Sequence, residues 1–500
     1  MKYYDQFPVY LTNSLGSKKE RLEPIQPDHI GMYVCGPTVY SDVHLGNVRT
    51  FLTFDVISRY LRYLGYKVRY VRNITDVGHL ENDADEGEDK IAKKARLEQL
   101  EPMEIVQTYT DGFHEVMQQF NILPPSIEPC ATGNIIEQIA ITKKLIEKGL
   151  AYEANGSVYF NVRKYNQSFH YGILSGRNIE ELMESGRELD RQDDKHEKID
   201  FALWKKASPA HIMRWPSPWS EGFPGWHIEC TVMSTKYLGE TFDIHGGGID
   251  LKFPHHECEI AQATGATGKA PVKYWIHSNM LTVNGQKMSK SLGNSFLPRE
   301  LFAGTHALLD RGYGPMAVRF FMLQSHYSST LDFSNEALGA AEKGFKKLVN
   351  ALGLVKKLEH PGGGQSGELS VELQRLVDEC FVNMSDDFNT AKTLAVLFEM
   401  SSRINDFKSG NLKLSGANEA TFNRFKNTYI GFMENVLGLE EEIGHSDELL
   451  SGTINVLIEL RKKARLDKNF MLSDKIRDDL KTLGVQLMDG KDGEINYTIE

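Results

Sequence analysis

The chain of 500 residues has a formal net charge of −11, and 41% of its residues are hydrophobic. This length exceeds what one core organises, so about two to four globular domains are expected, and the acidic balance excludes a uniformly basic nucleic-acid binder. The opening lacks the basic and apolar regions of a signal peptide and no apolar run reaches ~18 residues, which indicates a cytoplasmic protein without membrane contact.

The first predicted unit is a strand, a helix and a second strand. Residues 30–40 ("IGMYVCGPTVY") form a β-rich run, and apolar residues then recur every fourth position from Val48 to Leu64 until Gly65 ends the pattern. Residues 66–75 ("YKVRYVRNIT") are again typical of a strand. This order predicts a βαβ unit with a parallel sheet, whose first turn lies where open α/β sheets bind ligands.

A second α/β block follows later in the chain. Residues 241–253 ("TFDIHGGGIDLKF") predict a strand that ends in a Gly-rich turn, Pro254 begins a short helix, and residues 270–278 ("APVKYWIHS") predict another strand. The region between the blocks, 125–210, is typical of an inserted mixed domain. Its charged run 186–200 ("GRELDRQDDKHEKID") indicates a solvated loop or helix face.

The remainder of the chain is helical in pattern from about residue 305. The exception is 359–370 ("EHPGGGQSGELS"), whose Gly, Pro and Ser content indicates a flexible linker. The expected fold class is therefore α/β: a Rossmann-like parallel-sheet domain, split by the inserted mixed domain and followed by an α-helical C-terminal region.

Residues 44–47 ("HLGN") lie at the predicted turn from the first strand to the helix. Because Gly46 has no side chain, a flat or anionic ligand can approach the backbone there, and the helix presents unpaired N–H groups. His44 and Asn47 would then donate hydrogen bonds to phosphate oxygens. The alternative is that His44 and Asn47 only cap the helix.

Residues 280–294 ("MLTVNGQKMSKSLGN") are the second candidate phosphate site. Asn284 and Gly285 predict a two-residue hairpin, after which Lys287 and Lys290 lie on a Gly-flanked loop. Two ammonium groups suit a charge that develops late, such as that on a departing pyrophosphate. Such a loop alone is typical of an ordinary surface, but its occurrence together with "HLGN" on an α/β scaffold favours a phosphate site.

A candidate metal site is scattered over the two blocks. The five cysteines include no C-x-x-C pair, which argues against a disulfide framework. His255 and Glu259 are four residues apart and share a helix face, and two thiolates would complete a Zn²⁺ site. The candidate ligands are Cys35, Cys230, His255 and Glu259. Ordinary buried cysteines beside a polar helix are the alternative, and Cys258 and His256 are further candidates on the same helix.

These motifs resemble the class I aminoacyl-tRNA synthetases. "KMSKS" matches one signature of that class completely, and "HLGN" is similar to the other, H-I-G-H, with departures at Leu45 and Asn47. With "YVCGPTVY", "RNITDV", "GWHIEC" and "HGGG.DL.FPHHE.EIAQ", the chain resembles the cysteinyl-tRNA synthetase family over the catalytic region and the helical tail. Asn47 can donate a hydrogen bond but cannot carry charge, so a modest loss is expected at that position.

The resemblance implies a ligase that activates L-cysteine with ATP and Mg²⁺ and transfers the cysteinyl group to the terminal adenosine of tRNA(Cys), acting as a monomer. One zinc ion, held by Cys35, Cys230, His255 and Glu259, would bind the substrate thiol. The implied catalytic residues are His44, Asn47, Lys287 and Lys290. The implied ATP-binding residues are Gly46, His245, Gly246, Gly247 and Lys290, and those that shape the cysteine pocket are Thr75 and Trp226.

Zinc gives this selectivity a physical basis. Serine differs from cysteine by one atom, and a pocket alone discriminates such near-isosteres only ~10- to 200-fold. Zinc binds and deprotonates a thiol, whereas a neutral alcohol is a poor ligand, so editing becomes unnecessary.

The chain differs from the family pattern in one loop, and it resembles the family in its C-terminal segment as well. After "RNITDV" the chain has Gly78, His79 and the acidic stretch 80–90 ("LENDADEGEDK") where many relatives have Asp-Asp-Lys, so the role of this loop stays open. Residues 461–487 gather basic side chains around Phe470 and resemble the family's anticodon-recognition segment. An amphipathic helix that only packs on the bundle is the alternative for that segment.

The expected parts follow from the pattern and the resemblance together. They are two catalytic halves, an inserted connective domain, a helical stem-contact region, a linker, a helical bundle and an anticodon-recognition tail. In that order they span residues 1–124 and 211–304, 125–210, 305–358, 359–369, 370–445 and 446–500.

Two rival functions remain. A cysteine ligase that uses the same adenylation site but transfers to a sugar amine would lack the C-terminal tail that this chain keeps. A non-catalytic, zinc-stabilised RNA-binding protein would have no use for the intact "KMSKS" loop.

Overall fold

A computed structural model places most of the chain. The described residues are 2–80, 89–180, 194–209, 211–288, 292–364, 367–441, 445–489 and 495–499. They divide into two units, Met1–Glu440 and Glu441–Glu500, each described by itself below. In these ranges no helix combines the length and the apolar character that crossing a membrane requires.

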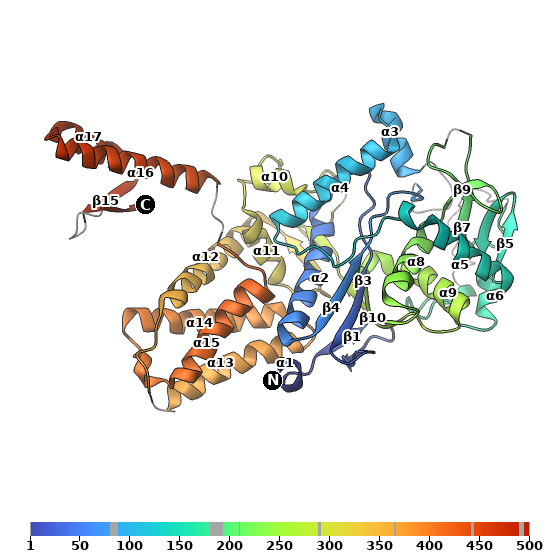
Figure 1. The fold of residues 1–500 in the computed structure, drawn as a ribbon, viewed down its shortest axis with the longest axis horizontal. Coiled ribbons are helices and arrows are strands. Elements are labelled where there is room, and N and C mark those ends of the chain that lie inside the picture. The colour runs from blue at the N-terminus through green and yellow to red at the C-terminus, as the bar shows by residue number, and fades with distance from the viewer. Residues whose placement is uncertain are drawn as a thin grey trace. The chain divides into compact units, whose positions relative to one another are not determined.

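A four-stranded parallel sheet carries the candidate site (Figure 1). Its strands and the helices between them are β3 (His29–Val34), α2 (Leu45–Leu64), β4 (Lys67–Arg72), α8 (Trp226–Leu238), β10 (Phe242–Gly248), α9 (His255–Thr267) and β11 (Val272–Ser278). The strand order is β11-β10-β3-β4, and every pairing is parallel. The structure therefore confirms both predicted α/β blocks and the fold class.

Helix α2 forms as its sequence pattern predicts. Its apolar side chains are buried, and Gly65 ends it in a left-handed conformation with φ of 106°, which glycine adopts without strain. Inside the helix, the buried Asp55 accepts hydrogen bonds from Arg59 at 2.8 Å and from Arg319 at 2.6 Å. Because Arg319 belongs to α11 (Pro315–Leu323), this buried ion network fastens α2 to the helical part of the chain.

The triple glycine of β10 corrects one expectation. Gly246, Gly247 and Gly248 pair with β11 as part of the strand instead of forming a turn, and the 3-10 turn η3 (Ile249–Lys252) follows them. A Cβ on Gly246 would lie 2.1 Å from the ring of Phe54 on α2. Close packing of this helix on the sheet therefore excludes a side chain at Gly246.

The inserted region forms a second, antiparallel sheet, to which two strands beyond residue 210 also belong. Its elements are α5 (Ile135–Glu147), β5 (Ala151–Ala154), β6 (Ser157–Phe160), α6 (Val162–Asn166), β7 (Phe201–Lys206), β8 (Trp215–Pro216) and β9 (Glu221–Pro224). The strand order is β5-β6-β7-β9-β8. Residues 181–193, which hold most of the predicted charged run, lie outside the described ranges, as do residues 81–88 of the acidic stretch.

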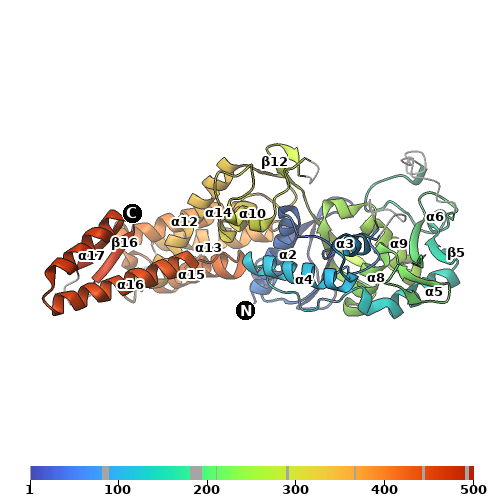
Figure 2. The ribbon, with the colours of Figure 1, turned by 90° about the horizontal axis from the view of Figure 1, so that it is seen from above.

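Helices dominate the chain after the catalytic sheet. They are α10 (Pro298–Ala303), α11, α12 (Asn335–Lys357), α13 (Glu368–Ser385), α14 (Thr390–Ser409), α15 (Glu419–Ile430) and the π-helical η5 (Gly431–Val436). Both views place the bundle of α12 to α15 on one side of the catalytic sheet and the inserted sheet on the other (Figures 1 and 2). The predicted linker is tied down where it is described: His360 Nε2 donates to the carbonyls of Leu414 and Ala417 at 2.9 and 3.1 Å.

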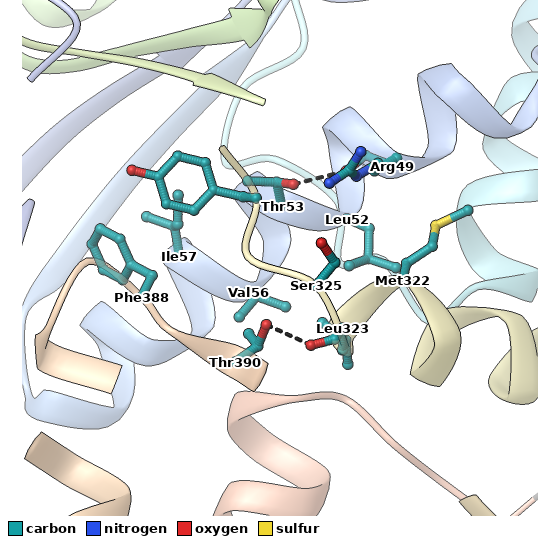
Figure 3. Close-up of a pocket in the computed structure, with 11 residues that line it drawn as sticks. Arg49, Leu52, Thr53, Val56, Ile57, Met322, Leu323, Ser325, Phe388 and Thr390 are labelled. Atoms are coloured by element: carbon teal, nitrogen blue, oxygen red, sulfur yellow. Dashed lines mark hydrogen bonds between the residues drawn. The ribbon is translucent and has the colours of Figure 1, made fainter. Parts of the chain in front are cut away.

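A small cavity lies where α2 meets α11 and the start of α14 (Figure 3). Apolar side chains of α2 line it together with Phe388 and Thr390, whose hydroxyl donates to the carbonyl of Leu323 at 2.7 Å. Its volume of about 20 Å³ holds roughly one water molecule. It is therefore a packing feature between these helices and too small for a substrate.

The remaining elements complete the two units. In the first unit they are α1 (Tyr3–Gln6), β1 (Tyr10–Asn13), β2 (Lys18–Arg21), α3 (Lys90–Glu98), α4 (Pro102–Gln119), the 3-10 turns η2 (Thr132–Asn134) and η4 (Leu414–Gly416), and the strands β12 (Leu281–Val283), β13 (Gln286–Lys287) and β14 (Leu331–Phe333). The second unit consists of α16 (His445–Leu466), α17 (Phe470–Thr482), β15 (Val485–Asp489) and β16 (Ile495–Ile499). The antiparallel pairing of β15 with β16 departs from the expected helical tail, because the β-branched and aromatic residues near its end pair as two strands.

Candidate functional site

A cavity of about 390 Å³ opens at the carboxyl ends of β3 and β10. This is the edge of the sheet at which the sequence predicts a ligand. Four segments line it: the loop from Cys35 to Asn47, the next turn of α2, the pair His79 and Lys90, and Trp226 with the turn after β10. Of the predicted site residues, Cys35, His44, Asn47 and Trp226 line this cavity.

The "HLGN" residues form the N-terminus of α2. His44 Nδ1 accepts a hydrogen bond from the Asn47 N–H at 3.3 Å, and Asn47 Oδ1 accepts one from the His44 N–H at 3.1 Å. This reciprocal capping box is the geometry of the capping alternative. Both side chains also line the cavity, so the cap fixes their orientation at its wall.

The predicted hairpin before "KMSKS" is confirmed. β12 (Leu281–Val283) pairs with β13 (Gln286–Lys287), and both turn residues have positive φ, 50° at Asn284 and 76° at Gly285. Lys287 is exposed at the end of β13, while Lys290 lies outside the described residues. A Cβ on Gly46 would lie 3.2 Å from Met288 Cε, so the described start of this loop touches the "HLGN" turn.

The four predicted metal ligands come together beside the cavity. Cys35 Sγ lies 3.5 Å from Cys230 Sγ and 3.6 Å from Glu259 Oε1, and His255 Nε2 lies 3.2 Å from the same oxygen. A tetrahedron with Zn–S bonds of about 2.3 Å separates two sulfurs by about 3.8 Å. All four residues are buried, and the separations fit one tetrahedral ion with little movement.

The electrostatics of this cluster favour two anionic ligands, Cys230 and Glu259, whereas burial and the neighbouring Cys230 raise the pKa of the Cys35 thiol. Burial opposes the charge of the Cys230 thiol, but hydrogen bonds with Cys35 and His255 lower its pKa to about 6. Burial likewise opposes ionisation of Glu259, yet the charge and hydrogen bonds of His245 and His255 lower its pKa to about 2. A thiolate and a carboxylate therefore face the point where a cation would sit.

A second arrangement shares two of these ligands. His256 Nε2 lies 3.4 Å from Cys35 Sγ, and His245 Nε2 lies 2.9 Å from Glu259 Oε2, so Cys35, His245, His256 and Glu259 also cluster. Cys258 does not join either set, because its sulfur contacts the Tyr171 hydroxyl at 3.4 Å in the core of the inserted sheet.

The other predicted site residues lie around the cluster at different depths. Trp226 stacks on His79, with ring centroids 4.0 Å apart, and contacts the ring of His255 at a tilt of 37°, with centroids 4.4 Å apart. Thr75 is buried behind the cavity wall and donates to Glu229 Oε2 at 2.9 Å. His245 is buried against Trp275 with its Nε2 on Glu259, so it lies behind the metal ligands and does not line the cavity.

Sequence reasoning missed several polar residues of the site. Asn73 Oδ1 accepts from the Gly36 N–H at 2.9 Å, and its Nδ2 donates to Thr75 Oγ1 at 3.1 Å. A Cβ on Gly36 would lie 1.6 Å from the Asn73 carbonyl oxygen, so only glycine fits that crossing. His227 Nδ1 contacts His255 Nδ1 at 3.0 Å and orients that ligand. Their position inside "YVCGPTVY", "RNITDV" and "GWHIEC" could have identified them as site residues.

Known proteins match the chain from end to end. A family model described as tRNA synthetases class I (C) catalytic domain matches residues 21–343, and a DALR domain model matches residues 382–441. A cysteine–tRNA ligase from Bacteroides fragilis is 54% identical over 491 residues, 98% of either chain. The chain belongs to the cysteine–tRNA ligase family. Other ligases of the family, from Cytophaga hutchinsonii and Chlorobaculum tepidum, are 54% and 48% identical over at least 96% of both chains.

Solved structures of other synthetases share the fold of this chain. Methionyl-tRNA synthetase from Mycobacterium tuberculosis, solved with methionyl-adenylate, aligns with a TM-score of 0.56 at 15% identity, covering 82% of this chain and 89% of that one. A putative arginyl-tRNA synthetase from Campylobacter jejuni aligns with a TM-score of 0.51 at 14% identity, covering 83% and 93%. These likenesses show the shared class I fold and confirm the predicted fold class.

Proposed function

We propose that this enzyme couples L-cysteine to ATP as cysteinyl-adenylate and then transfers the cysteinyl group to the 3′-terminal adenosine of tRNA(Cys). In the first step the cysteine carboxylate attacks the α-phosphorus of ATP, a P–O bond forms, and pyrophosphate leaves. In the second step the ribose hydroxyl attacks the acyl carbon, and AMP leaves with the electron pair of the cleaved bond.

The observation that carries this proposal is the buried cluster of Cys35, Cys230, His255 and Glu259 at the wall of the cavity. Its sulfur, nitrogen and oxygen donors are those that zinc prefers, and a bound zinc ion would supply thiol recognition by direct coordination of the substrate sulfur. Trp226 packs on His255 and would close the apolar side of the bound amino acid. One zinc per chain is expected, because the two ligand clusters found among the described residues share Cys35 and Glu259.

The phosphate end of the cavity would act through positioning and electrostatics. His44 and Asn47 are oriented by their reciprocal cap and face the cavity at the N-terminus of α2, where backbone N–H groups favour anions. Lys287 and Lys290 would neutralise charge on the departing pyrophosphate, which is paired with Mg²⁺. Catalysis would thus rest on charge stabilisation instead of general-base chemistry.

The parts outside the catalytic sheet would serve the tRNA. The helical bundle includes the segment that matches the DALR domain model, and the second unit carries the basic stretch with Phe470, which is 62% exposed. An exposed aromatic ring flanked by lysines and arginines suits stacking on an unpaired base. Action as a monomer in the cytoplasm and the expected partition into seven segments stay predictions.

Cysteine-dependent exchange of pyrophosphate into ATP tests the proposal. Purified protein is assayed with cysteine and with serine, and zinc is quantified on the same sample. Exchange with cysteine and near-silence with serine, at about one zinc per chain, is the expected result. Absence of exchange in protein with bound zinc would contradict the proposal and favour the RNA-binding rival, and transfer to a sugar amine in place of tRNA would favour the other ligase.

A further inference from the structure

His79 connects three parts of the cavity wall. Its ring stacks on the indole of Trp226 with planes 13° from parallel, its Nδ1 lies 2.6 Å from Thr38 Oγ1, and its Nε2 lies 2.8 Å from Lys90 Nζ. The Lys90 N–H also donates to the His79 carbonyl at 3.0 Å. His79 is 7% exposed, so these contacts fix a ring that has little room to turn.

The hydrogen bonds around this ring define which atoms donate. A lysine ammonium can only donate, so Nε2 of His79 accepts, and a neutral ring then carries its proton on Nδ1. Nδ1–H donates to Thr38 Oγ1, which leaves the Thr38 hydroxyl proton for another acceptor. Within the described ranges that hydroxyl has no second hydrogen-bond partner, and Thr38 lines the cavity next to the segment that begins at Cys35.

The stacking contact reaches the metal cluster. Trp226 lies between the His79 ring and the ring of His255, a predicted zinc ligand. Displacement of His79 would therefore free one face of the indole and shift the pocket that meets the substrate side chain. A shift of about 1 Å in a positioning group can cost about a hundredfold in rate.

We propose that His79 is a positioning residue for the amino-acid substrate. It holds Trp226 against the metal cluster, and it turns the Thr38 hydroxyl proton toward an anionic oxygen of that substrate, its carboxylate. This inference rests on the function proposed above and deepens it. It gives a role to the Gly78–His79 segment, at which the sequence departs from the family pattern.

Two variants separate the stack from the hydrogen bonds. His79→Ala removes both and is expected to raise KM for cysteine about tenfold in pyrophosphate exchange, with KM for ATP changed less than about twofold. His79→Phe keeps an aromatic ring on Trp226 and should raise KM for cysteine by a smaller factor. His196→Ala is the matched control, because His196 also stacks on an aromatic ring, that of Tyr152 at 3.6 Å, but does not line the cavity.

A double-mutant cycle tests whether His79 acts through Thr38. Thr38→Val removes the hydroxyl and keeps the shape, and combining it with His79→Phe should cost no more than Thr38→Val alone. If the two substitutions raise KM for cysteine independently, so that their factors multiply, His79 does not act through Thr38. An equal rise of KM for ATP and for cysteine would overturn the assignment to the amino-acid pocket.

Equilibrium binding of cysteine to the zinc-loaded proteins, measured by calorimetry, separates this inference from the proposed function. A wild-type protein that binds cysteine but lacks exchange contradicts the proposed function. The affinity ratio between wild type and His79→Ala still tests the positioning role in that case: a loss of about tenfold supports it, and equal affinities overturn it.

Discussion

The proposed metal end and the proposed phosphate end of the site are built in opposite ways. At the metal end, each of Cys35, Cys230, His255 and Glu259 is at most 6% exposed and held by several neighbours. At the phosphate end, His44 and Asn47 are half-buried in a helix cap, and Lys287 is exposed. A site that distinguishes sulfur from oxygen needs fixed, desolvated donors, whereas a site for phosphate must admit a large, hydrated ligand.

We expect the largest effect on activity from a substitution in the metal cluster. Cys230→Ser should lose zinc and reduce the preference for cysteine over serine, measured as the ratio of kcat/KM values, about 10⁴-fold. Metal analysis and exchange kinetics on one preparation measure both. Cys258→Ser is the matched control, since this buried sulfur lies outside the cluster. Serine rejection that survives the loss of metal would contradict zinc selection.

The next largest effect is expected at the phosphate end. Lys290→Ala should lower the rate of adenylation about 10²- to 10³-fold, because the variant removes one of the two cations proposed to stabilise the developing charge. Cysteine affinity, measured by calorimetry, should stay within about twofold, since this end does not contact the thiol. Lys269→Ala, which removes an exposed lysine paired with Glu240, is the control. An exchange rate within about threefold of wild type would contradict the role.

A smaller effect separates capping from catalysis at His44. Serine is also a good N-cap, so His44→Ser should leave the free energy of unfolding nearly unchanged, whereas His44→Ala should lower it by about 1 kcal/mol. Both variants should slow adenylation about 10- to 100-fold if the imidazole contacts phosphate. Full exchange activity in His44→Ser would indicate that His44 only caps α2 and does not take part in catalysis.

The last prediction concerns the stability of the protein and Gly246, a residue of β10. Gly246→Ala should lower the free energy of unfolding by about 1 to 3 kcal/mol, because its methyl group would overlap the Phe54 ring. Phe54→Leu should restore part of the loss, and Gly353→Ala, at a position with open space, is the control. An unchanged free energy of unfolding with a raised KM for ATP would instead place Gly246 against the adenosine.

Local sequence patterns determined much of the fold. Apolar residues recur at every fourth position of α2 until Gly65 ends the helix, and Asn284 and Gly285 form a hairpin. These features, like the alternation of strands and helices, depend on neighbouring residues in the chain. The triple glycine was misread as a turn because the reason for Gly246 is a contact with Phe54, which is far away in sequence. The periodicity of apolar residues indicates which secondary structure a segment can form. It does not indicate which distant residues pack against that segment.

The sequence by itself determined which residue types are available for the site, and the tertiary structure decided which of them meet. Family resemblance gave Cys35, Cys230, His255 and Glu259 as one set, and spacing alone left Cys258 and His256 open. The fold places Cys258 in the core of the inserted sheet, away from the cluster, and keeps His256 beside Cys35, so His256 stays a second candidate ligand. It also brought His79 onto Trp226, a pairing of distant segments that chain order cannot reveal, because contacts across a sheet depend on packing.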